Sequence, residues 1–226
     1  PASRPDSSGM ETSPSYPIGK CPSRESLSPE ERAELIRDIR ELPARLRESV
    51  AGLSRARLDT SYRDGGWTVR QVVHHLADSH LNAFARSKLV LTEDNPRIKP
   101  YDQDAWANTP DGKDADIEAS LGLIEGLHAR WAMLLGSLAP EDFGRTMDHP
   151  ERGKLSLSWL LQLYAWHSRH HVAHIDHAHE KGGGNDNAGH HPHGQEEVRV
   201  ADDGVQVGGR RQQEHPTPHG DPSDGG

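Results

Sequence analysis

The sequence has 226 residues, of which 32% are hydrophobic and 5% aromatic, and its net charge is −9. Apolar content this low cannot bury the whole chain in a packed core. The acidic balance argues against a nucleic-acid partner, since phosphate backbones require a basic surface. No apolar run reaches the roughly 18–20 residues of a membrane span, and no signal-peptide pattern opens the sequence. We therefore expect a cytoplasmic protein without a membrane partner.

The two ends of the sequence differ in composition from its middle. Pro, Ser and Gly dominate the first 20 residues, and the stretch from Gly182 onward is rich in Gly and His but poor in large apolar residues. Such segments bury too little apolar surface to offset their chain entropy. We expect residues 1–20 and 182–226 to be disordered and residues 21–181 to form one folded domain. Cys21, the single cysteine, excludes an internal disulfide and a thiolate zinc cluster.

Apolar residues recur at helical spacing in four stretches of this middle part. The first two begin after capping patterns, in which a hydroxyl residue precedes Glu or Gln by three positions. The expected helices run from Ser28 to about Val50, from Thr68 to about Leu91, from near Asp114 to Pro140, and from after Ser156 to Lys181. This pattern predicts an all-α protein built as a four-helix bundle.

Two features interrupt the simple bundle pattern. Pro43 lies inside the first helical stretch and should kink that helix or break it in two. The connection 92–113 is long for a bundle, so we expect it to be either functional or a crossover. No convincing alternating run predicts a β-strand.

The fourth helical stretch carries three histidines where its apolar stripe should continue. His167, His171 and His174 share one face, and Leu163 points the same way a turn earlier. Buried imidazoles are costly unless each finds a partner. Two histidines four positions apart on a helix can chelate one divalent metal. The pattern therefore predicts a metal site on this helix.

A third ligand should come from the second helix, which offers three histidines. Spacing places His80 near the middle of its apolar face, His75 at the edge and His74 furthest away. Periodicity therefore ranks His80 with His75 and does not choose between them.

A metal-free alternative is a polar core in which the histidines pair with Tyr164 and Asp78. Asp78 is also placed to orient a neighbouring imidazole, and Tyr164 to donate to a bound oxyanion. Isolated histidines such as His128 and His149 are expected to be side chains that are either solvated or capped by a local hydrogen bond.

Two long motifs in these helices resemble a known family. They are YRDGGWTVRQVVHHLADSH, from Tyr62 to His80, and WHSRHHVAHI, from Trp166 to Ile175. Both resemble the YfiT group of the DinB-like superfamily, and the resemblance extends over about residues 16–175. It implies a DinB-like four-helix bundle with one divalent metal per subunit, held by the second His of the His-His-Leu-Ala motif and by a His-x3-His pair. Transferred to this sequence, the ligands are His75, His167 and His171.

The resemblance also implies an activity. The family is described as metal-dependent hydrolases, while relatives in the superfamily transfer low-molecular-weight thiols, and dimers are frequent. Three protein ligands leave an open coordination position, which suits catalysis. We expect a hydrolase that activates water for a small-molecule substrate. The first alternative is an S-transferase for a low-molecular-weight thiol, and the second is a non-catalytic metal-binding protein.

Histidine ligation suits several divalent ions, and we favour Zn²⁺ with Ni²⁺ second. His80 and His174 are the candidates for a general base or for a residue that orients a ligand. We expect a homodimer.

Overall fold

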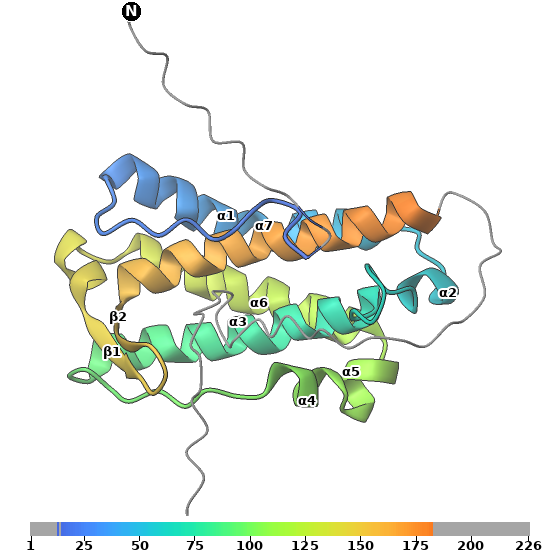
Figure 1. Ribbon diagram of the computed structural model, residues 1–226. Helices are drawn as coiled ribbons and strands as arrows, with labels where there is room; N and C mark the ends of the chain where they lie inside the picture. Colours follow the sequence, from blue (N-terminus) through green and yellow to red (C-terminus); the bar gives the residue numbers. More distant parts are fainter. Residues whose placement is uncertain (1–12, 14, 183–226) are drawn as a thin grey trace, which may run out of the picture.

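A computed structural model describes residues 13 and 15–182 of the chain (Figure 1). Residues 1–12, 14 and 183–226 lie outside the described residues, and with them most of the two segments that the sequence predicts to be disordered. The elements are α1 (Pro29–Val50), α2 (Arg55–Leu58), α3 (Val69–Thr92), α4 (Gln103–Ala107), α5 (Pro110–Asp114), α6 (Ile117–Gly136), the 3-10 helix η1 (Pro140–Gly144), β1 (Thr146–His149), β2 (Gly153–Ser156) and α7 (Leu157–Gly182).

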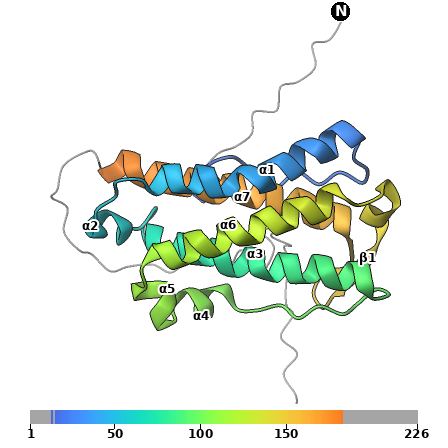
Figure 2. The same cartoon turned by 180° about the vertical axis from the view of Figure 1, so that it is seen from behind.

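Four long helices form the bundle, which confirms the predicted fold class. Helix α1 packs against α6 and α7, and α3 packs against the same two helices. Figures 1 and 2 show that α1 and α7 run in one direction and that α3 and α6 run in the opposite one. Among the described helices, none combines the length and the apolar character that crossing a bilayer requires.

The helix starts follow from their capping residues. The Ser28 and Thr68 hydroxyls accept the backbone N–H groups of Glu31 and Gln71, whose side chains accept the N–H groups of the capping residues in return. Helix α6 begins later than expected, because Asp114 ends α5 and Asp116 caps the next helix.

Pro43 does not break the first helix in two, which was one of the two outcomes expected from the sequence. Helix α1 continues through Pro43, and Ile39, Leu42 and Leu46 on either side of it are almost fully buried. Packing of this apolar face against α6 and α7 offsets the cost of the proline.

The long connection after α3 is a crossover. Because α3 and α6 run in the same direction, the chain has to return along the bundle before α6 begins (Figure 1). On the way it pairs with the hairpin, where the Ile98 N–H donates to the Asp148 carbonyl, and it forms α4 and α5, which contact α3.

A two-stranded antiparallel hairpin precedes α7 and was not expected from the sequence. Thr146 pairs with Ser156 and His149 with Gly153, whose φ of 70° suits glycine. Each strand has only four residues, so its pattern is weak in the sequence.

The core gives a direct test of the packing. Leu46 of α1 is fully buried, whereas Met133 of α6 is 70% exposed. We expect Leu46→Ala to lower the free energy of unfolding by about 2–5 kcal/mol, since it leaves a cavity. Met133→Ala is the control and should change it by less than about 0.5 kcal/mol. Chemical denaturation of the two variants measures both values, and equal effects would contradict this packing.

Candidate metal centre

Three histidines from α3 and α7 converge inside the bundle. His75 is in the first half of α3, and His167 and His171 are one turn apart on α7. The Nε2 atom of His167 lies 3.2 Å from that of His75 and 3.1 Å from that of His171. The structure thus brings together the two histidines that spacing pairs and the one that the resemblance adds. We call these three residues the three-histidine cluster.

The three-histidine cluster is buried and electrically neutral. Its members are exposed by 3%, 4% and 6% in chain order. Burial, helped by neighbouring histidines, lowers the pKa of His75 to about 3 and holds the pKa values of His167 and His171 well below the usual range. Neutral imidazoles have a free lone pair, which is the form that binds a metal.

The spacing of these nitrogens fits a divalent cation. A tetrahedral zinc ion with Zn–N bonds of about 2.0–2.1 Å separates its ligand atoms by about 3.4 Å. The two Nε2 separations of 3.1 and 3.2 Å are close to that value. The second ring nitrogen of His171 has no hydrogen-bond partner in the described part of the chain.

The other two histidines of α3 point elsewhere. His74 contacts α6 and the segment before it, where its Nδ1 lies 2.8 Å from Ser120 Oγ and its Nε2 3.2 Å from the Ala115 carbonyl. His80 lies outside the cluster, and its Nε2 is 3.0 Å from the Nδ1 of His167. His80 therefore contacts the back of a cluster member and does not face the same point.

His174 lies one turn beyond His171 on α7. Its ring stacks on Tyr62, with centroids 4.1 Å apart, and its centroid is 5.4 Å from that of His171. His170, His171 and His174 form a second group whose ring nitrogens lie within 4.8 Å of one another. His171 belongs to both groups, so one ion at either would use it.

Asp78 and Tyr164, the two other residues considered for the site, lie in different surroundings. The described residues include no hydrogen bond between the Asp78 carboxylate and an imidazole, and burial together with Asp111 raises the pKa of Asp78 to about 6. The Tyr164 hydroxyl is buried and accepts a hydrogen bond from Ser79. Tyr164 therefore belongs to the core around the site.

Of the two alternatives expected for His128 and His149, solvation is wrong. Both are buried, at 0% and 1% exposure. His128 lies four residues after Ile124 and three before Trp131, on the buried stripe of α6. That position is the signal that could have placed His128 in the core.

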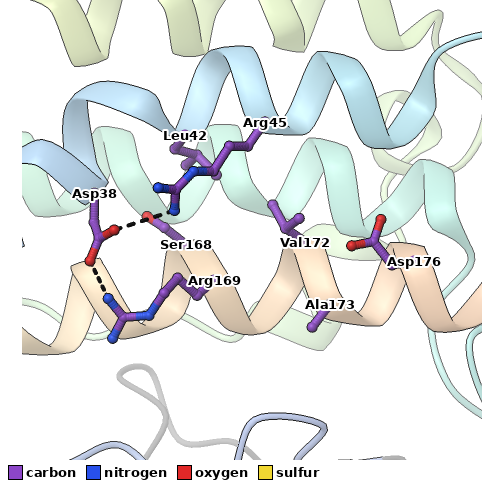
Figure 3. Close-up of a pocket in the computed structure, with 8 residues that line it drawn as sticks. All are labelled: Asp38, Leu42, Arg45, Ser168, Arg169, Val172, Ala173 and Asp176. Carbon is purple, nitrogen blue, oxygen red and sulfur yellow. Dashed lines mark hydrogen bonds and ion pairs between the residues drawn. The ribbon is translucent and has the colours of Figure 1, made fainter.

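A surface groove of about 130 Å³ lies between α1 and α7 (Figure 3). Asp38 at one end pairs with Arg45 and with Arg169. Ser168 and Val172 line its α7 side. No member of the three-histidine cluster lines this groove, so the groove and the candidate metal site are different places.

The protein is thus a four-helix bundle with a buried cluster of three histidines that is suited to binding a metal ion. The family model of the DinB superfamily matches residues 38–175, and the chain belongs to this superfamily. This confirms the resemblance noted in the sequence.

Individual relatives are similar over most of their length. The chain is 51% identical to the Bacillus subtilis protein named "Putative metal-dependent hydrolase YfiT" over 162 residues, which are 71% of this chain and 91% of the relative. It is also 51% identical to a protein of the same description from Oceanobacillus iheyensis over 160 residues, 71% of this chain and 92% of that one. The solved structure of YfiT from Bacillus subtilis, described as a probable metal-dependent hydrolase with an unusual four-helix bundle topology, matches with a TM-score of 0.74 and 48% identity and covers 75% of this chain and 98% of that structure.

Proposed function

We propose that this protein is a metal-dependent hydrolase whose His75, His167 and His171 hold one divalent cation. The observation that carries the proposal is that the Nε2 atoms of His75 and His171 both lie within 3.2 Å of the Nε2 of His167 inside the bundle. The names of the similar proteins support the same activity. Zn²⁺ is the favoured ion and Ni²⁺ the second, because imidazole ligands suit both.

A bound cation would act as a Lewis acid that lowers the pKa of a water ligand and polarises a substrate carbonyl or other electrophile. The chain supplies the conditions for this chemistry. Three neutral ligands leave the charge of the ion uncompensated, and burial keeps the surrounding dielectric low. Three ligands also leave room for a fourth.

His174 is the better of the two candidates for moving a proton. His174 lies beside the cluster, with its ring centroid 5.4 Å from that of His171 and its ring stacked on Tyr62. His80 lies behind the cluster, where it contacts the Nδ1 of His167. We therefore assign His174 as the candidate general base.

The ring of Trp67 lies 4.6 Å from that of His75, and the Nε1–H of Trp67 donates to Asp104. Trp67 thus packs against His75.

The test is a screen of the full chain with esters, amides and pairs of a thiol with an electrophile. We expect hydrolysis that a chelator abolishes and Zn²⁺ or Ni²⁺ restores. Thiol transfer without hydrolysis would replace this proposal with the S-transferase reading. Metal binding without turnover of any substrate would favour the non-catalytic reading. We further propose a cytoplasmic homodimer, on the basis of the family resemblance and the composition of the chain.

A further inference from the structure

A row of buried histidines leads from the metal cluster across the bundle. The Nδ1 atom of His167 lies 3.0 Å from the Nε2 of His80, whose Nδ1 lies 2.9 Å from the Nε2 of His128. The Nδ1 of His128 lies 2.5 Å from the carbonyl oxygen of Ile39. These residues come from α7, α3, α6 and α1 in turn, so the row links all four long helices. We call His167, His80 and His128 the histidine row.

The carbonyl at the end of the row decides where each proton lies. A carbonyl oxygen only accepts, so His128 has to donate from Nδ1, and its Nε2 in the neutral ring is then an acceptor. His80 consequently donates from Nδ1 to His128 and accepts at Nε2. His167 donates from Nδ1 to His80, which leaves the lone pair on its Nε2. That lone pair faces His75 and His171.

The Ile39 carbonyl is available because of Pro43. In an α-helix the carbonyl of residue 39 accepts the N–H of residue 43. Proline has no N–H, so Pro43 removes this donor from the middle of α1. His128 supplies the missing donor from the neighbouring helix. Pro43 thus leaves the Ile39 carbonyl open to His128, and this carbonyl anchors the row.

Packing prevents water from replacing these hydrogen bonds. His80 and His128 are both fully buried, and their rings stack with centroids 4.9 Å apart. The ring of Trp131 meets both edge-on, at 5.9 and 5.8 Å. A ring held on two sides in this way cannot turn to exchange its two nitrogens without moving the core around it.

We propose that His80 and His128 are positioning residues which, anchored on the Ile39 carbonyl, keep the proton of His167 on Nδ1 and aim the Nε2 lone pair of His167 at the metal. The inference rests on the proposed metal site. Partners that fix the tautomer of a ligating histidine commonly contribute 10–100-fold to metal affinity. Ile39 acts through its backbone, so its side chain is not part of the proposal.

The first test compares the Zn²⁺ affinity of full-length variants by competition with a chromophoric chelator. His80→Phe keeps an aromatic ring and removes both nitrogens, and we expect it to weaken the tight site about 10–100-fold. His128→Phe should weaken it less, because His80 still contacts His167. The matched control is His74→Phe, a buried histidine of the same helix outside the row, which should leave the affinity unchanged. Unchanged affinity in both row variants would overturn the proposal.

The second test reads the tautomers directly and does not depend on any variant folding. Two-bond ¹H–¹⁵N correlations of ¹⁵N-histidine-labelled wild-type protein without metal should show His128, His80 and His167 with the proton on Nδ1. A proton on Nε2 of His167 would overturn the histidine row and leave the hydrolase proposal standing. If the protein binds no ion at the three-histidine cluster, the proposed function is overturned. The tautomers of the metal-free protein would still test the hydrogen bonds of the histidine row.

Discussion

Replacing any member of the three-histidine cluster is expected to remove tight metal binding. His167→Ala leaves His75 and His171 without the ligand that lies between them, at 3.2 and 3.1 Å from their Nε2 atoms. Removing a direct ligand should weaken metal affinity by more than the 10–100-fold that is typical when a hydrogen-bonded partner of a ligand is removed. We therefore expect each of His75→Ala, His167→Ala and His171→Ala to raise the Kd for Zn²⁺ by more than about 100-fold in isothermal titration calorimetry.

His74→Ala is the matched control for these variants. His74 is the chain neighbour of His75, but its ring nitrogens contact Ser120 and the Ala115 carbonyl. We expect its Kd to equal that of the unmodified protein. If His74→Ala lost the ion and His75→Ala kept it, the assignment of the third ligand would be wrong.

Lowering the pH is expected to reduce the stability of the metal-free protein strongly. Burial lowers the pKa of His75 to about 3, of His128 to about 4 and of His170 to about 2, while a histidine in the unfolded chain titrates near 6.5. Below about pH 6.5 the unfolded chain therefore binds protons that the folded chain does not. Stability is retained above that pH and is lost as the pH falls toward the folded-state values.

The expected loss is large compared with the free energy of unfolding of an ordinary domain. Each such histidine lowers the free energy of unfolding by about 1.4 kcal/mol for every pH unit below 6.5. At pH 5 the three together cost about 6 kcal/mol, against a typical total of about 5–15 kcal/mol. Asp78 acts in the opposite direction, because its pKa is raised to about 6, but it is one group against several.

Urea unfolding in chelator at pH 7 and pH 5 measures this loss. We expect the midpoint to fall steeply at pH 5, and His128→Phe to reduce the pH dependence because it removes one of the three groups. Equal unfolding free energies at the two pH values would show that these histidines are not held neutral in the fold.

The helices and their starts could be predicted because the signals are local. The Ser28 and Thr68 capping patterns involve residues three positions apart, and both form as expected. The His167/His171 pair likewise follows from one helical turn. Each of these inferences uses the direction of side chains around a single helix axis.

The choice between His75 and His80 could not be made in this way. Periodicity gives the direction in which a side chain points, but not the level at which the neighbouring helices meet it. In the structure His75 lies opposite His167 and His171 of α7, whereas His80, further along α3, lies between His167 and His128. Only the packing of α3 against both α6 and α7 assigns these different roles.

The link between Pro43 and His128 could not be predicted from the sequence for the same reason. His128 and the carbonyl that it contacts are 89 positions apart in the sequence. A proline in a helix predicts a free carbonyl one turn earlier, but it does not predict which side chain will reach it.

The central claim is that one divalent ion is held by Nε2 of His75, His167 and His171. A crystal structure of the full chain grown with Zn²⁺, with anomalous data collected at the zinc edge, tests it most directly. We expect one strong anomalous peak about 2.0–2.1 Å from each of the three Nε2 atoms, with a further position open to water or substrate. A peak on His170, His171 and His174 instead, or no peak inside the bundle, would contradict it.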